Sequence, residues 1–363
     1  MLAGLVLAFM ATERARSRCR ERLELLADSS EDVDSLRRDV IAELKRAIGF
    51  DRWCAPLVDP DTLIAHTGIA ETDHIAELPR LQVRDASARE VNNGIALARR
   101  RDRVGMLSAV TGGDLARSQR WRESLQRFGT GDELRVVAAD ERGCWGRFDM
   151  WRDHSDGPFS PEDAQFLRDA ASLFGRGMRK ATVGLRERTP SAPLQSGVLL
   201  VGGDLRPRGG TPAVYEWFRA LNPAGMPYPG GIPSLVWSTI GRLIAAEAGE
   251  DPQRPVRIRV RAGNGSWAVI EAARLDDPDR TIAISVHAAT ADEILRLVSR
   301  AYGLSGRERE LVTLITKGQD TSAIAEHMSI SRYTVQDHLK SIFGKLGVHN
   351  RLELLTRLLA QAV

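Results

Sequence analysis

The chain has 363 residues and a formal net charge of only +3. This length predicts two or three domains, because single hydrophobic cores stop growing at roughly 250–300 residues. The small net charge excludes a uniformly basic nucleic-acid coat but not a local DNA-binding module. The three cysteines, Cys19, Cys54 and Cys144, are too widely spaced for a disulfide framework or a zinc site, and they fit a reducing cytoplasm.

Residues 1–32 begin with the apolar run Met1–Ala11, which four arginines follow at alternate positions from Arg14 to Arg20. The run is shorter than the ~20 apolar residues of a transmembrane helix. A signal peptide would carry positive charge before its apolar core rather than after it. We therefore expect an N-terminal helix that packs on the first domain, or an upstream start codon, and no membrane partner.

Residues 33–185 are predicted to form one α+β domain. A helix over Val33–Ile48 leads to a strand over Trp53–Val58, which ends in the turn Asp59-Pro60-Asp61. The stretch Glu71–Arg103 is charged and only weakly periodic, and it supports no assignment. Further strands are predicted at Glu133–Ala138 and Cys144–Trp151.

A long helix is then predicted to begin at Ser160-Pro161-Glu162-Asp163, which supplies a cap, a proline at the first helical position and acids in the first turn. This order of helix, strand meander and helix resembles a GAF domain, which implies a small-ligand sensor. If Cys54 and Cys144 met in its pocket, the domain could instead be a thiol redox enzyme or sensor. Free cysteines are more often small buried hydrophobes, and we expect neither a metal nor a cofactor.

Residues 186–196 are polar with two prolines and predict a linker. Residues 197–290 predict a second α+β domain, in which Asn264-Gly265 is a strong hairpin signal. Its elements are a strand over Gly197–Val201, a loop over Gly202–Gly210, helices over Pro212–Leu221 and Ser234–Ala248, and strands over Val256–Ala262, Gly265–Leu275 and Thr281–His287. This order resembles a PAS-like sensor fold. Residues 291–303 predict a connecting segment with a helix over Ala291–Tyr302.

Residues 304–363 predict four short helices from their capping residues. Ser305 with Glu308 and Asn350 with Glu353 read as capping boxes, and Asp320 and Ser331 are N-caps for the two helices between. On the third helix, one face is predicted to be buried and the other to be polar. The buried positions are Val335, Leu339, Ile342 and Leu346, and the polar ones are Tyr333, Gln336, Asp337, Lys340 and Gly344.

Two helices joined by a short turn, the second with an exposed polar face, are typical of a helix-turn-helix. The segment resembles the LuxR/FixJ-type (GerE) helix-turn-helix through Leu304, Arg307-Glu308, Lys317-Gly318, Ile324-Ala325, Ile330-Ser331, Thr334-Val335, His338-Leu339, Ile342, Lys345-Leu346-Gly347-Val348 and Asn350-Arg351. Two runs in the preceding domains, one of them Gly112–Arg152, further resemble the sensory part of LuxR-type regulators from actinobacteria.

The resemblance implies base-reading side chains at Gln336, Asp337 and Lys340, beside Tyr333 on the same face. It implies contacts to the DNA backbone near Thr334, Lys345 and Arg351. The sequence departs from the family where Gln336 replaces a frequent Lys and Asp337 replaces a neutral residue, which leaves the bases that are read open. The last helix has more leucine than a small bundle needs, and this predicts a dimer contact through Leu354, Leu355, Leu358 and Leu359.

Together these features predict a cytoplasmic, non-enzymatic, multidomain transcription regulator with a GAF-like domain, a PAS-like domain and an all-α four-helix LuxR-type DNA-binding domain. The expected partners are double-stranded DNA, a second copy of the chain and an unknown ligand or protein at the sensory domains, with RNA polymerase as a further candidate. The alternatives are the thiol redox protein and an interaction protein in which Tyr333–Gly344 binds another protein. The operator and the sign of regulation stay open.

Overall fold

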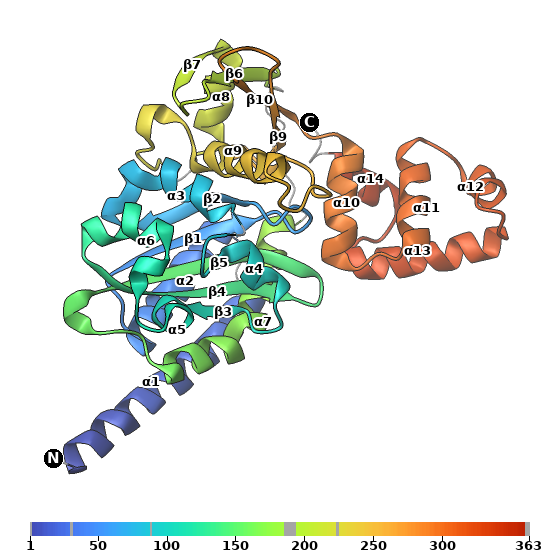
Figure 1. Cartoon of the computed structure of the whole chain (residues 1–363). Coiled ribbons are helices and arrows are strands. Elements are labelled where there is room, and N and C mark those ends of the chain that lie inside the picture. The colour runs from blue at the N-terminus through green and yellow to red at the C-terminus, as the bar shows by residue number, and fades with distance from the viewer. Residues whose placement is uncertain (1, 30–31, 88, 185–193, 223–224, 360–363) are drawn as a thin grey trace.

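The computed structural model describes residues 2–29, 32–87, 89–184, 194–222 and 225–359, without the side chains of residues 2–12, 73, 74, 78 and 359. Within these residues the chain forms two antiparallel sheets with helices on their faces, and a C-terminal bundle of short helices (Figure 1). The chain is thus multidomain. The predicted linker over 186–196 lies mostly outside the described residues.

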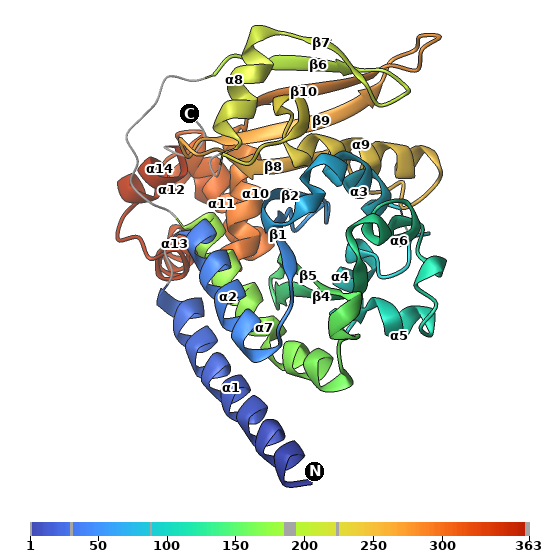
Figure 2. The ribbon, with the colours of Figure 1, turned by 90° about the vertical axis from the view of Figure 1, so that its left-hand side faces the viewer.

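The first sheet has the strand order β2-β1-β5-β4-β3, and the strand pairs are antiparallel. Its strands are β1 (Arg52–Val58), β2 (Ala65–Glu71), β3 (Val104–Met106), β4 (Thr130–Asp140) and β5 (Gly143–Asp153). The two longest strands, β4 and β5, lie at and beside its centre, and most of their residues are buried, because helices cover both faces of the sheet (Figure 2).

Long helices cover one face of this sheet and short helices cover the other (Figure 2). The long helices are α1 (Leu2–Ser29), α2 (Val33–Ala47) and α7 (Pro161–Val183), and the short ones are α3 (Leu78–Asp85), α4 (Gly94–Arg99), α5 (Leu107–Thr111) and α6 (Gln119–Glu123). Helix α7 begins at the predicted cap Ser160, which forms a capping box with Asp163. Its Phe174 meets Phe148 of β5 edge to face, with the ring centroids 5.2 Å apart.

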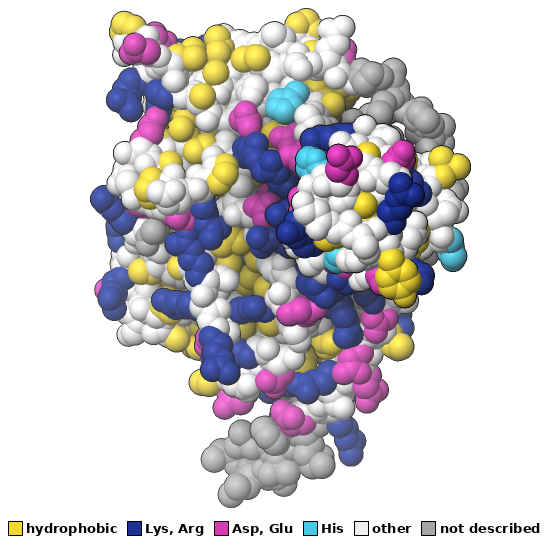
Figure 3. Space-filling model, turned by 90° about the vertical axis from the view of Figure 1, so that its right-hand side faces the viewer, with side chains coloured by type: hydrophobic (Ala, Val, Ile, Leu, Met, Phe, Trp, Pro, Cys, Tyr) yellow, Lys and Arg dark blue, Asp and Glu magenta, His cyan; other side chains and the backbone are white. Residues whose placement is uncertain are grey.

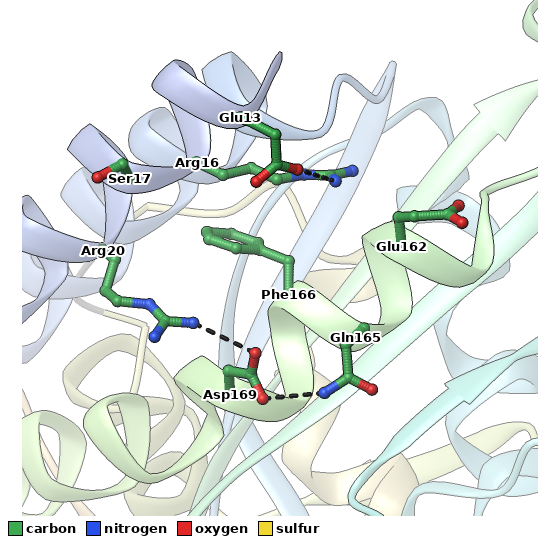
Figure 4. A pocket seen from close by; sticks show the side chains of 8 residues that line it. All are labelled: Glu13, Arg16, Ser17, Arg20, Glu162, Gln165, Phe166 and Asp169. Atoms are coloured by element: carbon green, nitrogen blue, oxygen red, sulfur yellow. Dashed lines mark hydrogen bonds and ion pairs between the residues drawn. The ribbon is translucent and has the colours of Figure 1, made fainter. Parts of the chain in front are cut away.

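Helix α1 is attached to α7 along its second half, while its first half projects from the body (Figure 1). Arg16 pairs with Asp163 at 2.7 Å and Arg20 with Asp169 at 3.3 Å. These pairs flank a groove of about 420 Å³ into which Phe166 points (Figure 4). The prediction that the N-terminal helix packs on the first domain is confirmed for this half. No described helix is long and apolar enough to span a membrane.

The short helices cover a set of buried ion pairs in addition to two small apolar clusters. Arg135 of β4 lies 2.6 Å from Asp85 and 3.1 Å from Glu133, and Arg147 of β5 lies 2.7 Å from both Asp85 and Asp149. Buried charges are stable only when they are paired and hydrogen-bonded in this way. These ion pairs occupy the space between β4, β5 and the end of α3.

The second sheet repeats the strand order of the first, as β7-β6-β10-β9-β8. Its strands are β6 (Gly197–Val201), β7 (Pro207–Gly210), β8 (Arg257–Arg261), β9 (Trp267–Arg274) and β10 (Ile282–Ala288), and its helices are α8 (Pro212–Ala220) and α9 (Ser234–Glu247). A tight turn with Gly265 at φ 82° joins β8 to β9, as Asn264-Gly265 predicts.

The two sheet-containing domains meet where α9 packs on α3. A side chain at Gly241 would come within 2.7 Å of the Cα of Val83, so only glycine allows the two helices to approach this closely. Ser238 donates a hydrogen bond of 2.8 Å to Gln82 across the same contact. The contact fixes the second domain on the short-helix side of the first.

The C-terminal helices are α10 (Ala291–Tyr302), α11 (Gly306–Thr316), α12 (Thr321–His327), α13 (Arg332–Leu346) and α14 (Arg351–Leu359). Helix α10 has the predicted bounds and ends at Gly303, whose left-handed conformation (φ 66°) suits glycine. Short 3-10 turns elsewhere span Asp73–Glu77, Leu115–Arg117, Leu125–Phe128, His154–Asp156 and Pro229–Gly231.

One sequence prediction needs correction, and one unassigned stretch has regular structure. The loop expected over Gly202–Gly210 contains β7, a short edge strand that its glycines and proline concealed, and it forms because β6 supplies its partner backbone. The unassigned stretch Glu71–Arg103 contains α3 and α4. Their apolar faces are held by long-range contacts, with α3 against α9 and α4 against β4, which local periodicity does not show.

Candidate DNA interface

Helices α12 and α13 are joined by a tight turn that capping side chains define on both sides. Asp320 begins α12 by accepting hydrogen bonds from the backbone N–H groups of Ser322 and Ala323 at 2.9 and 2.8 Å. Ser329 then takes a left-handed conformation (φ 53°), and Ser331 begins α13 by accepting from the N–H of Thr334 at 3.0 Å. Both predicted caps are confirmed, and the pair has the helix-turn-helix arrangement.

One face of α13 is buried against the other C-terminal helices, and α11–α14 are called the module below. The predicted stripe of Val335, Leu339, Ile342 and Leu346 is buried. These four side chains join the same hydrophobic cluster as Leu311 and Ile315 of α11 and Ile324 of α12. This packing fixes the orientation of α13, and it therefore determines which of its side chains face solvent.

The opposite face of α13 is polar and exposed. Tyr333 is 75% exposed, and Gln336, Asp337, Lys340 and Gly344 are exposed too. Thr334 is half-buried, with its hydroxyl 2.9 Å from that of Ser331. The N-terminal half of α13, which carries Tyr333 to Lys340, points away from the two sheet-containing domains (Figure 1). The first five predicted DNA-binding residues therefore lie together on an accessible surface.

The two remaining predicted contact residues are engaged within the module. The ammonium of Lys345 lies 2.8 and 2.7 Å from the two carboxylate oxygens of Glu308, which also accepts from Ser341 at 2.6 Å and from the N–H of Ser305 at 2.6 Å. Burial would raise the pKa of Glu308, but these hydrogen bonds outweigh it and lower that pKa to about 2. Arg351 donates to the backbone carbonyl of Gln319.

Glu308 is a residue whose second role the sequence did not reveal. It completes the predicted capping box with Ser305, and its carboxylate also binds Lys345 from α13. One carboxylate thus holds the start of α11 to the end of α13. The other predicted box is modified: Asn350 accepts from the N–H of Glu353 at 2.8 Å, but the carboxylate of Glu353 accepts from the N–H of His349 at 2.8 Å.

The leucines predicted for a dimer contact differ in exposure. Leu354 and Leu358 are buried within the chain and Leu355 is half-buried, while the side chain of Leu359 lies outside the described residues. Leu354 and Leu358 belong to the hydrophobic cluster that also contains Leu295 and Val298 of α10. Among the described side chains of α14, Leu352 is the exposed large apolar one, at 74%.

The module is held to the rest of the chain by arginines along its border. Arg300 of α10 lies 2.9 Å from Asp61, and Arg179 of α7 donates to the carbonyl of Ala301 at 2.8 Å. Lys and Arg side chains line this border in the space-filling view (Figure 3). The sequence predicts only a turn at Asp59-Pro60-Asp61, although its two carboxylates could have indicated arginine partners.

The two cysteines of the thiol alternative lie in surroundings that disfavour thiolate chemistry. Cys54 and Cys144 are free, buried and part of two separate hydrophobic clusters. Burial is the largest effect on both groups and raises the pKa of each thiol to about 12. Reactive cysteines instead have depressed pKa values at partly exposed sites.

Comparison with known proteins assigns the C-terminal helices to a family. Residues 303–358 match the family described as bacterial regulatory proteins, luxR family. The chain is 41% identical over 61 residues to the transcriptional regulatory protein DesR of Bacillus subtilis, covering 17% of this chain and 31% of DesR. It is 43% identical over 54 residues to the monoamine regulon transcriptional regulator of Klebsiella aerogenes, covering 15% and 24%.

These similarities extend over only 61 and 54 residues, and the chain spans less than a third of the length of either relative. Among solved structures, a Vibrio cholera VqmA–ligand–DNA complex is similar at 16% identity, covering 47% of this chain and 86% of that one with a TM-score of 0.20. This score is too low to bear on the arrangement of the domains. Residues 303–358 therefore form a LuxR-type DNA-binding domain, to which α11–α14 belong.

Proposed function

With a LuxR-type DNA-binding domain at residues 303–358, we propose that the chain is a cytoplasmic transcription regulator. The observation that carries this proposal is the exposed polar face of α13 on a helix whose other face is buried in the module. In a helix-turn-helix, the second helix enters the major groove and reads base edges with such a face. The first two domains then control how this helix meets DNA.

The exposed side chains of α13 are suited to reading several different bases. Gln336 can make a bidentate pair with adenine, Asp337 can accept from cytosine N4, and Lys340 can donate to guanine O6 and N7. Thr334 lies at the start of the helix, where phosphates would pass. Lys345 and Arg351 would contact the DNA backbone by redirecting hydrogen bonds that they make to Glu308 and to the carbonyl of Gln319.

A dimer is the natural state for reading a two-fold operator, with half-sites about one helical turn, ~34 Å, apart. We place the dimer contact on α14, where Leu352 is exposed and Leu355 is half-buried. Leu354 and Leu358, which the sequence predicts at this contact, are buried beneath this surface, and Leu359 is the last residue of the same helix. RNA polymerase is a further candidate partner once two copies are bound to DNA.

We propose a GAF-like fold for the first domain and a PAS-like fold for the second, both of the kind found in actinobacterial LuxR-type regulators. In support, each sheet has helices on its faces and both share one strand order. A small molecule or protein partner bound there would act on α10, which leads directly into α11 and which Arg300 and Arg179 tie to the first domain.

The test is fluorescence anisotropy of the full chain on labelled DNA from its own upstream region, across a salt series. Neutralising Z phosphates makes log K fall against log salt with a slope of about −0.9Z. We expect saturable binding that is tighter than to random DNA of equal length, with a slope that indicates several phosphate contacts. If the full chain does not bind its upstream DNA more tightly than random DNA, a genomic pull-down with the full chain follows. Failure to enrich any sequence there would contradict the proposal and favour a protein-binding role for α13.

A further inference from the structure

A cavity of about 120 Å³ lies between the two sheet-containing domains, next to the contact of α9 with α3. Its walls come from the residues around α4 in the first domain, and from α9 and the segment after α9 in the second. Three arginines line it: Arg99, Arg242 and Arg254. Two acidic residues, Glu250 and Asp251, line it too.

Arg242 is the unusual member of this set, because it is only 2% exposed and pairs with backbone rather than with a carboxylate. Its guanidinium donates to the carbonyls of Glu250 at 2.7 Å, Arg254 at 3.4 Å and Asp251. Its Nε is buried and has no hydrogen-bond partner among the described residues. Carbonyl oxygens satisfy donors but do not neutralise the positive charge. Among the described residues, no carboxylate pairs directly with Arg242, and the charge of Glu250 acts on it only from a distance.

The carboxylates at the cavity are committed to other cations. Asp251 pairs with Arg99 and, at 2.7 Å, with Arg254. Glu250 accepts from Ser87 at 3.3 Å and lies 3.7 Å from Arg89, which does not line the cavity. Burial, and after it the charge of a neighbouring arginine, lowers the pKa of Arg99, Arg242 and Arg254. Positive charge is therefore in excess at this cavity.

We propose that the cavity binds a small oxyanion between the two sheet-containing domains. The chemical class is inorganic phosphate or a short carboxylate, because both present oxygens to the forked donors of arginine. A cavity of about 120 Å³ has room for a small ion of this kind. Bound there, the anion would neutralise Arg242 and join Arg99 of the first domain to Arg254 of the second.

Two successive contacts link the cavity to the connecting helix α10. Arg254 donates to the carbonyl of Asp61 at 3.4 Å, and the carboxylate of Asp61 pairs with Arg300 of α10. An anion that repositions Arg254 would therefore act on the turn that holds α10. The binding site itself goes beyond the proposed function and does not depend on DNA binding.

The test is isothermal titration of the full chain at constant ionic strength, with inorganic phosphate, sulfate and malonate as separate probes and chloride as the balancing anion. We expect saturable binding of one anion per chain. Preference for phosphate and sulfate would indicate a tetrahedral ligand, and preference for malonate a carboxylate. Arg99→Gln should weaken binding about tenfold, the effect of losing one charge-assisted hydrogen bond.

Arg100→Gln is the matched control, because Arg100 is exposed, adjacent in sequence and outside the cavity lining. Arg100→Gln should leave the anion affinity unchanged. Arg254→Gln is a second test variant, and it should weaken anion binding as much as Arg99→Gln does. Heats of dilution alone for all three probes would overturn the proposal. Equal losses in Arg99→Gln and Arg100→Gln would overturn it as well, since they would reflect general surface charge. DNA anisotropy on the same variants separates failure of this site from failure of the DNA-binding function.

Discussion

Arg259 of β8 in the second sheet donates two hydrogen bonds to Asp59, which directly follows β1 of the first sheet. Its Nε and Nη2 each lie 3.0 Å from a different carboxylate oxygen. The N–H of Arg259 also donates to Asp59 at 3.0 Å, and both residues are buried. The same guanidinium contacts Asp61 at 2.6 Å and the carbonyl of Glu293 in α10 at 3.3 Å. One arginine therefore joins the first domain, the second domain and the connecting helix.

Replacing Asp59 by Asn should uncouple the two sheet-containing domains. Removing one partner of a buried ion pair typically costs about 3–5 kcal/mol, because the other charge stays buried. The cost falls on the domain interface, so we expect calorimetry to show two separated unfolding transitions where the native chain shows greater overlap. Arg257→Gln is the control: Arg257 is two positions away on β8, and its side chain is 36% exposed. A single unshifted transition in Asp59→Asn would contradict this role.

Replacing Lys340 by Ala should weaken specific DNA binding and change base preference at one position of each half-site. A base-edge contact of this type is worth about 1–3 kcal/mol, and its loss relaxes specificity locally. Competition binding with a set of single-base operator variants measures this. Arg296→Ala on α10, where Arg296 is exposed and pairs with Asp292, is a charge-matched control that should bind as the native chain does. Identical base preferences in Lys340→Ala would remove Lys340 from the interface.

Substitutions at Lys345 and at its partner Glu308 should change DNA affinity in opposite directions. If Lys345 contacts a phosphate, Lys345→Ala should lower affinity equally for all sequences and reduce the salt slope by about one. Glu308→Gln should retain the capping bond to Ser305 but free the ammonium, so it should maintain or increase DNA affinity. Anisotropy across the salt series distinguishes these outcomes. An unaltered slope in Lys345→Ala would mean that this ammonium only stabilises the module.

The hydrogen bonds to Glu308 also predict a pH dependence for the DNA-binding domain. The folded pKa of about 2 lies below the ordinary glutamate value near 4.3. The stabilisation, at most about 3 kcal/mol, is therefore complete above roughly pH 5 and is lost as pH falls toward 2. Amide exchange in α11 and α13, corrected for intrinsic rates, should show the native domain losing protection faster than Glu308→Gln between pH 5 and 3. Parallel pH profiles for the two proteins would contradict this.

How much the sequence predicts depends on whether a feature is local. The bounds of α10, the caps at Ser160, Ser305 and Ser331, and the buried stripe of α13 follow from residues within a turn or two of each other, and all are confirmed. The partners of Asp59 and Asp85 are arginines far away in the sequence, so no local pattern could identify them. The engagement of Lys345 by Glu308 was missed for the same reason.

The buried cysteines allow a direct test of the thiol alternative. With pKa values raised to about 12 by burial, the thiols of Cys54 and Cys144 stay protonated at neutral pH, and the thiolate is the reactive form. In the native chain, both should therefore react with a thiol reagent far more slowly than an unstructured cysteine, and at the unstructured rate once denaturant unfolds the chain. Cys19, also buried with a pKa raised to about 12, is an internal reference outside the proposed redox pair. Peptide mapping of the labelled protein resolves the three sites. Rapid native labelling of Cys54 or Cys144, together with altered DNA binding in Cys144→Ser, would restore the redox alternative, whereas slow labelling of all three would mark them as packing residues.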